Sequence, residues 1–173
     1  MLKKVLCISA ALALAVSLTA CSTYLEKSGT YDVETGDRVK ITVDAKAGYD
    51  ITLEAPFVIS KDDETILNGT FLYSEYLEEY KSAYEAEPTA SLVDEGEKDG
   101  NEYFCYAVGD EYDYFVKVGD SNTAVILAST ASEEEASAAF NSTVMPKCSN
   151  ADRQMPVRIR PGTCAFHRFR CTH

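Results

Sequence analysis

Residues 98–128 read KDGNEYFCYAVGDEYDYFVKVGDSNTAVILA, and this stretch decides the fold. The Asp99-Gly100 pair is a strong signal for a two-residue hairpin turn, so it predicts antiparallel strands on either side. A strand over residues 103–108 leaves that turn, and apolar residues alternate with polar ones over residues 112–118. The apolar run over residues 123–128 suits a central strand that is covered on both faces. With a short strand at residues 91–93, the stretch predicts a four-stranded antiparallel meander.

Three further strands are expected before the meander. Apolar and polar residues alternate over residues 39–43 and again over residues 49–53, which is typical of half-buried strands. Residues 65–72 form a third strand segment, which contains Gly69. A glycine inside a strand often marks a bulge or a close approach to the backbone, and we expect one of these at Gly69.

Two helices complete the predicted elements. Ser74 can cap a helix whose apolar residues follow Tyr73 at offsets of 3, 4, 7 and 11, which is one stripe of a helical period: Tyr76, Leu77, Tyr80 and Tyr84. A closing helix is predicted after Ser132, because Ser132 and Glu135 have the spacing of a capping box. The order of elements predicts an α+β fold, an antiparallel sheet with one or two helices packed on it.

The amino terminus has the layout of an export signal over residues 1–20. Met1-Leu2-Lys3-Lys4 precedes an apolar run over residues 5–16, which is too short to span a bilayer. The segment Leu18-Thr19-Ala20-Cys21 resembles a bacterial lipobox. That resemblance implies that Cys21 carries a diacylglyceryl group and anchors the chain, facing outward, on the bacterial cell membrane. The alternative is an ordinary cleaved signal in which Cys21 is incidental.

The chain divides further by composition. Residues 21–36 are mostly polar and are predicted to be a tether, followed by a domain over residues 37–145 and a tail over residues 146–173. Between Cys21 and Pro146 there are 27 acidic and eight basic side chains, whereas residues 147–173 have a net charge of +5. The formal charge of the whole chain is −12, which disfavours binding to nucleic acid.

The tail has three possible interpretations. Its prolines and its bias toward Arg, Cys and His favour a disordered segment that resembles out-of-frame translation. A disulfide-bonded extension that includes Cys105 is a second possibility outside the cytoplasm. A zinc site is the third, but the spacing lacks the paired ligands of known zinc motifs: Cys148, Cys164, His167, Cys171 and His173. We therefore predict no metal and no cofactor.

The acidic domain resembles the small extracytoplasmic domains of the PsbP and DcrB type. The resemblance covers residues 37–145 and rests on the order of elements, with Gly48-Tyr49-Asp50-Ile51-Thr52-Leu53 and Pro56-Phe57 near its beginning and a last helix that starts at Ser132. It implies the fold, and it says little about activity because proteins of unrelated roles share this fold.

Residues that could carry catalysis are scarce. Residues 21–146 contain no histidine, and the sequence lacks a nucleophile elbow, a P-loop and a zinc-protease motif. Cys105 sits in mid-strand, where a buried and unreactive thiol is expected. Two acidic groups could bind calcium, but solvated loop charge is the favoured interpretation for both: Asp32, Glu34 and Asp37, and Asp110, Glu111 and Asp113.

Tyrosine is the more informative residue type, since the chain has eleven. Packing between helix and sheet accounts for many of them, but aromatic rings also stack on sugars or receive partner chains. We name five as possible ligand-binding residues: Tyr76, Tyr80, Tyr84, Tyr112 and Tyr114. The sequence thus predicts a lipid-anchored, non-enzymatic module that binds an envelope protein or a small ligand such as a glycan. The alternative is a glycan hydrolase that uses carboxylates.

Overall fold

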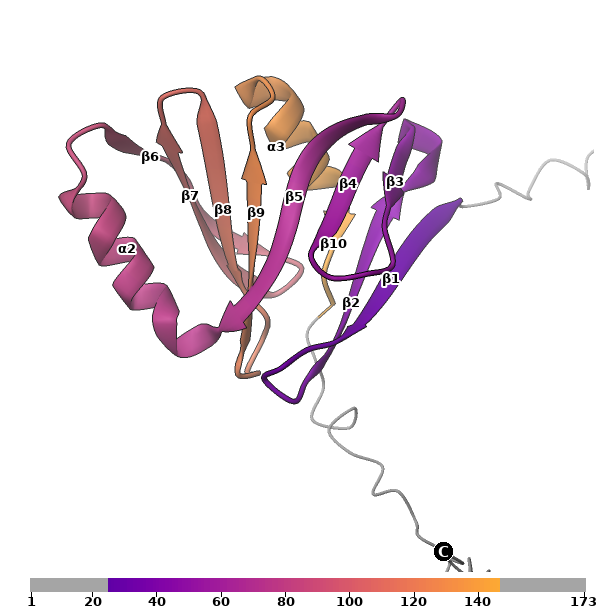
Figure 1. Ribbon diagram of the computed structural model, residues 1–173, viewed down its shortest axis with the longest axis horizontal. Coiled ribbons are helices and arrows are strands. Elements are labelled where there is room, and N and C mark those ends of the chain that lie inside the picture. The colour runs from indigo at the N-terminus through magenta and orange to yellow at the C-terminus, as the bar shows by residue number, and fades with distance from the viewer. Residues whose placement is uncertain (1–24, 147–173) are drawn as a thin grey trace, which may run out of the picture.

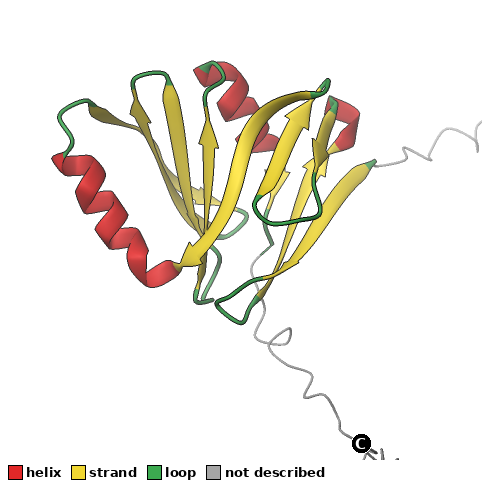
Figure 2. Cartoon of the chain, in the orientation of Figure 1, coloured by secondary structure: helices red, strands yellow, loops and turns green. Residues whose placement is uncertain are grey.

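The computed structural model describes residues 25–146 as an arrangement of two antiparallel sheets and two α-helices (Figures 1 and 2). The predicted signal over residues 1–20, Cys21 and residues 147–173 of the tail lie outside the described residues. The predicted α+β class is confirmed in its broad form, and strands dominate this part of the chain. The single predicted sheet is replaced by two sheets.

The larger sheet has seven strands in the order β3-β4-β5-β9-β8-β7-β6. Their bounds are β3 (Tyr49–Ile51), β4 (Phe57–Lys61), β5 (Glu64–Tyr73), β6 (Ala90–Lys98), β7 (Asn101–Val108), β8 (Glu111–Lys117) and β9 (Thr123–Ser129). The predicted meander is confirmed as β6 to β9, and β6 is much longer than the expected strand at residues 91–93. Asp99 and Gly100 both have positive φ, as the two-residue turn between β6 and β7 requires.

The smaller sheet has the order β1-β2-β10, with β1 (Glu26–Asp32), β2 (Arg38–Asp44) and β10 (Thr143–Val144). Its apolar side chains share one core with the larger sheet, where Ile41 and Phe57 are completely buried. Helix α3 (Glu133–Ser142) contributes Ala136, Ala139 and Phe140 to the same core. The expected capping box between Ser132 and Glu135 starts this helix and is confirmed.

Helix α2 (Leu77–Ala86) lies on the other face of the larger sheet, where it buries Leu77 against Phe115 and Ala124. In Figure 1 it runs along the left side of the sheet, beside β6 and β7. A short 3-10 helix, η2 (Ser74–Tyr76), precedes it. The predicted cap at Ser74 is wrong, because the Ser74 hydroxyl donates instead to the carbonyl of Ser121 at 3.2 Å. The start of η2, which leads directly into α2, is thus held by a tertiary hydrogen bond to the turn between β8 and β9.

The tether predicted over residues 21–36 is wrong for the residues that form β1. This strand pairs with β2 along its whole length, from Glu26 opposite Asp44 to Asp32 opposite Arg38. Only Gly29 and Tyr31 of β1 are buried, so the strand has almost no apolar pattern of its own. Another 3-10 helix, η1 (Ala45–Ala47), connects β2 to β3.

Two further differences concern β3 and β4. The strand expected over residues 49–53 ends at Ile51, and Leu53 is 70% exposed. Strand β4 was not among the strands predicted from the sequence, and the charged residues 61–64 join it to β5. Those charged residues form a tight hairpin turn in which Asp62 and Asp63 have positive φ.

Candidate functional site

One ten-residue helix does not cover the whole face of a seven-stranded sheet (Figure 2). Side chains leave hollows near this helix. Leu77 anchors the helix, and partly buried side chains of the sheet pack around this contact: Leu72, Phe104 and Ile126. The helix is acidic in its first turn and carries tyrosines toward both of its ends. Three hollows near α2 and β5 are candidate places for a ligand.

Three tyrosines are exposed where β5 runs into α2. The side chains of Tyr73, Tyr76 and Tyr80 are 41%, 45% and 40% exposed. The rings of Tyr73 and Tyr76 meet edge to face, with centroids 6.3 Å apart. A hollow of about 290 Å³ lies next to them, lined by Leu72, Tyr76, Glu79, Tyr80 and Ala83. We call Leu72, Tyr73, Tyr76 and Tyr80 the tyrosine surface.

A second hollow of about 470 Å³ continues the tyrosine surface on the other side of Leu72 and Tyr73. Its remaining walls come from the β1–β2 turn, including Glu34, and from the cis Ala55–Pro56 peptide between β3 and β4. The Tyr73 hydroxyl donates to the Glu34 carbonyl at 3.2 Å, which holds the ring in the wall of this second hollow. Since Leu72 lines both hollows, the tyrosine surface is a single extended feature.

The third hollow, of about 580 Å³, lies on the opposite side of α2, between its first turns and strands β6 to β8. Its charged lining consists of four carboxylates and two ammonium groups, and the ring of Phe104 lies beside them: Glu75, Glu78, Glu95, Glu102, Lys81 and Lys117. The Lys81 ammonium lies 3.6 Å from the Glu95 carboxylate and 5.7 Å from the centroid of Phe104. We call this the acidic hollow.

The five tyrosines predicted as ligand-binding residues have three different fates. Tyr76 and Tyr80 belong to the tyrosine surface. Tyr84 is half-buried, and its hydroxyl donates to the Asp113 carboxylate at 2.6 Å. Tyr112 packs against the core on the opposite face of the sheet. Tyr114 is only 3% exposed and stacks on Phe140 with centroids 4.4 Å apart, so its prediction as a ligand-binding residue is wrong.

Sequence reasoning did not include Tyr73 among the ligand-binding candidates. Tyr73 is the last residue of β5 and not part of α2, although it precedes Tyr76, Tyr80 and Tyr84 at helical spacing. Thr123 of β9, which lies opposite it, is buried, whereas Tyr73 itself is 41% exposed. Its position just before a predicted helix was the signal that could have identified it.

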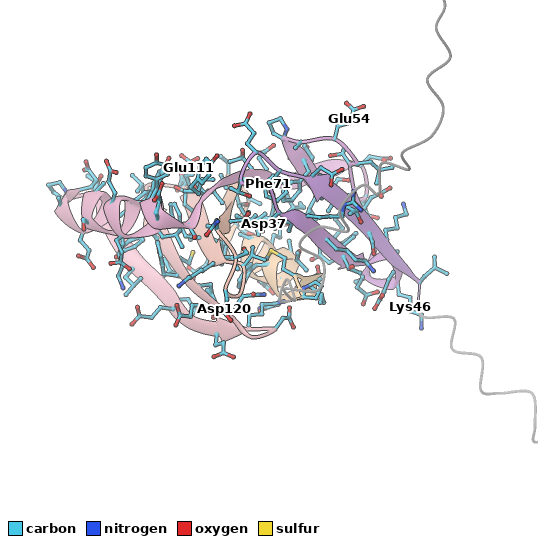
Figure 3. All side chains as sticks on the ribbon, turned by 90° about the horizontal axis from the view of Figure 1, so that it is seen from below. Asp37, Lys46, Glu54, Phe71, Glu111 and Asp120 are labelled. Carbon is cyan, nitrogen blue, oxygen red and sulfur yellow. The ribbon has the colours of Figure 1, made fainter. Side chains whose placement is uncertain are left out.

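The favoured interpretation of the two acidic groups as solvated loop charge is wrong for Asp37 and Asp113, which are buried, whereas the other four carboxylates are exposed. Asp32 forms an ion pair with Arg38 at 2.7 Å, which lowers the pKa of Asp32. Asp37 is buried and accepts hydrogen bonds from the Asn122 backbone N–H at 3.1 Å and from the Thr123 hydroxyl at 2.9 Å. Seen from below in Figure 3, Asp37 lies near the middle of the molecule and joins the β1–β2 turn to the β8–β9 turn.

Asp113 is a buried carboxylate next to α2. It is 7% exposed, and burial raises its pKa while the hydrogen bond from Tyr84 opposes that rise. It does not line any of the three hollows, so it is enclosed between α2 and the sheet. Among residues 25–146, no three His, Cys, Asp or Glu side chains are grouped so as to hold a metal ion.

Cys105 is completely buried, as predicted from its place in mid-strand. Burial raises the pKa of its thiol to about 12, which removes the thiolate needed for a nucleophile. No α-helix or 3-10 helix within residues 25–146 is long and apolar enough to cross a membrane.

Comparison with protein families, curated proteins and solved structures finds no match for this chain. The chemistry of the three hollows is therefore the basis for interpreting the function.

Proposed function

We propose that this chain is a lipid-anchored protein of the bacterial cell envelope that binds a protein or a small ligand at the tyrosine surface without transforming it. The observation that carries the proposal is the exposure of Tyr73, Tyr76 and Tyr80, each 40% or more, along two connected hollows. Exposed aromatic side chains that cluster beside a hollow are typical of interaction sites.

Tyrosine suits such a surface for two physical reasons. Its ring offers a large apolar contact area with only two rotatable side-chain bonds, so little conformational entropy is lost on binding. Its hydroxyl also supplies a hydrogen bond at the edge of the contact. The edge-to-face contact between Tyr73 and Tyr76 and the bond from Tyr73 to Glu34 hold the rings in place before a ligand arrives.

The charge of the domain restricts the class of ligand. Residues 21–146 carry 27 carboxylates and eight basic side chains, so phosphate-rich ligands such as nucleic acids are repelled. Glu34 and Glu79 lie at the edges of the tyrosine surface. A neutral glycan, or a protein segment without excess negative charge, matches these features.

Titration of the full chain, purified in mild detergent, against peptidoglycan fragments, neutral glycans and envelope extracts tests this proposal. We expect Tyr76→Ala and Tyr80→Ala to weaken retention of the bound component by about tenfold or more, because aromatic anchors dominate binding energy. Leu53→Ala removes an exposed apolar side chain outside the tyrosine surface and is the matched control. Equal retention by all three variants would contradict the proposal.

The glycan hydrolase is the second candidate, and the carboxylates of the acidic hollow favour it. Paired carboxylates beside an aromatic ring could in principle cleave a glycosidic bond. The same titration separates the two functions if product release is measured along with retention. Turnover that is lost in Glu95→Gln or Glu102→Gln would replace the binding proposal with the hydrolase.

The anchor is tested separately at Cys21. The lipobox-like segment Leu18-Thr19-Ala20-Cys21 predicts that Cys21→Ser leaves an unprocessed precursor that no longer incorporates labelled fatty acid. Ser22→Ala serves as the control, since it leaves the sulfur of Cys21 in place. Continued labelling of Cys21→Ser would exclude Cys21 as the site of acylation.

A further inference from the structure

Strand β6 forms an edge of the larger sheet, and its outer side is open. It is nine residues long, and all seven residues between Ala90 and Lys98 are exposed, with Leu92 at 47% and Val93 at 38%. Within the described part of the chain, only β7 pairs with β6. Such an edge presents unpaired N–H and C=O groups on which another strand can add.

The register shows which backbone groups face outward. The Asp99-Gly100 turn makes Lys98 and Asn101 the hydrogen-bonded pair that closes the hairpin. Bonded and non-bonded pairs alternate from there, so Glu97 opposite Glu102 and Glu95 opposite Phe104 are non-bonded pairs. The backbone N–H and C=O of Glu95 and Glu97 therefore point away from β7.

The side chains next to these groups are negatively charged. Glu95, Glu97 and Glu102 share one face of the hairpin, the face on which α2 and the acidic hollow lie. Glu97 and Glu102 are directly opposite each other, which is a destabilising arrangement for like charges. Lys98 does not relieve this repulsion, because its ammonium donates to the Thr143 carbonyl and to Asp99. Within residues 25–146, Lys81 is ion-paired to Glu95, and neither Glu97 nor Glu102 has an ion pair.

We propose that β6 receives an extended segment of a partner protein that carries Lys or Arg at every second position and adds to the sheet as an eighth strand. In such a strand, alternate side chains fall on the face of Glu95 and Glu97. A basic side chain there would neutralise Glu97 and Glu102, and its neighbour would reach the mouth of the acidic hollow. The backbone bonds supply affinity, and the alternating charge supplies specificity.

A second copy of this chain is a poor occupant of the same edge. Pairing two β6 strands would place Asp94, Glu95 and Glu97 of one copy beside the same carboxylates of the other, and like charges across a pair are repulsive. The carboxylates therefore protect β6 from self-association while leaving it open to a basic strand. This site is separate from the tyrosine surface, with which it shares no residue.

The test uses the full chain in mild detergent and a fluorescent nine-residue peptide with Lys at alternate positions and Val or Thr between them. A peptide of the same composition with its lysines consecutive is the control for charge alone. We expect the alternating peptide to bind at least about tenfold more tightly, since only its lysines share one face of a strand. On binding, hydrogen exchange should slow at the amides of Glu95 and Glu97. Equal binding of both peptides, or unchanged exchange at these amides, would overturn the proposal.

Two variants separate backbone pairing from charge. Glu97→Pro removes an N–H that faces solvent and bonds to nothing in β7, so the hairpin can tolerate it while the outer edge is blocked. Glu97→Gln removes only the charge. We expect the affinity for the alternating peptide to fall by about tenfold or more in Glu97→Pro and by less in Glu97→Gln. Wild-type affinity of a folded Glu97→Pro variant would contradict strand addition, and the exchange measurement decides the question if that variant does not fold.

Two further binding measurements exclude other occupants of the β6 edge. Tyr76→Ala should bind the alternating peptide as tightly as the wild type, so failure of the function proposed for the tyrosine surface would leave this site untouched. A chain that ends at Pro146 should also bind like the full chain. If it binds about tenfold more tightly, the basic residues 147–173 of the same chain occupy the edge, and the proposal of a separate partner is overturned.

Discussion

The ring of Phe57 lies over Gly69, its partner across β4 and β5, so closely that a β-carbon on Gly69 would lie 2.1 Å from Cζ of the ring. Phe57 is completely buried and is one of three aromatic side chains packed together, with ring centroids 5.1 Å from Tyr31 and 5.4 Å from Phe71. The absence of a side chain at Gly69 thus makes room for the aromatic group that joins the two sheets. This confirms the close approach that was expected at this glycine.

Gly69→Ala should lower the free energy of unfolding by about 1–3 kcal/mol, because the added methyl group overpacks a filled core. Gly96→Ala is the matched control, since a β-carbon there would meet Tyr103 at an ordinary distance of 3.5 Å. Urea unfolding followed by circular dichroism measures both. An unchanged midpoint for Gly69→Ala would show that Phe57 can move aside without loss of stability.

The elements that sequence analysis predicted correctly are those fixed by neighbouring residues. The Asp99-Gly100 turn and the capping box of Ser132 and Glu135 are made by local chemistry that is visible in the sequence. Strand β1 is different, because Glu26–Asp32 has little apolar pattern and forms only through pairing with β2. Ser74 likewise lost its predicted role to a partner 47 residues away. Contacts between distant segments decide such cases, and no local pattern encodes them.

The candidate site was predictable only as a set of tyrosines. Helical spacing placed Tyr76, Tyr80 and Tyr84 on one stripe, but the sheet beneath the helix decides how each side chain is used. Asp113 of β8 draws the Tyr84 hydroxyl inward, whereas the side chains of Tyr76 and Tyr80 are 45% and 40% exposed. The free edge of β6 was not predicted either, since strand order in a sheet depends on long-range pairing.

Cys105 should be unreactive as long as the domain is folded. Burial raises the pKa of its thiol to about 12, so almost no thiolate exists at pH 8. We expect alkylation of Cys105 by iodoacetamide to be more than about a hundredfold slower in buffer than in 8 M urea, with the site identified by peptide mass mapping. Comparable rates in both solutions would mean that the strand opens frequently.

Asn101 should be one of the most sensitive polar positions. Its side chain is 1% exposed, accepts from the Gly119 backbone N–H at 2.8 Å and donates to the Met145 carbonyl. Asn101→Ala would leave both backbone groups without these partners, so we expect a loss of about 2 kcal/mol or more in the free energy of unfolding. Asn122→Ala changes an exposed side chain in a turn and should stay within about 0.5 kcal/mol of the wild type. Similar midpoints of urea unfolding for both variants would show that water replaces the lost hydrogen bonds of Asn101.

The pair of Tyr84 and Asp113 predicts a specific dependence of stability on pH. Burial raises the pKa of Asp113 above its ordinary value of 3.8, so folding favours the protonated carboxyl. The resulting stabilisation is fully present below the ordinary pKa and is lost as the pH rises through the raised pKa. Asp113→Asn cannot ionise and keeps an oxygen that can accept from Tyr84. Its free energy of unfolding, relative to the wild type, should therefore increase between about pH 3 and pH 7.

Tyr84→Phe completes this experiment. Removing the phenol hydroxyl takes away the hydrogen bond that opposes the rise in the pKa of Asp113, so the charged carboxylate becomes still less stable in the fold. We expect a loss of about 1–3 kcal/mol at pH 7 and a smaller loss at pH 3, where the carboxyl is protonated. In the double variant with Asp113→Asn, the pH dependence of that loss should disappear, since no ionisable group remains at position 113. The difference in the free energy of unfolding between Asp113→Asn and the wild type could instead be independent of pH. That result would mean that Asp113 titrates like an exposed carboxylate and that α2 does not seal it from water.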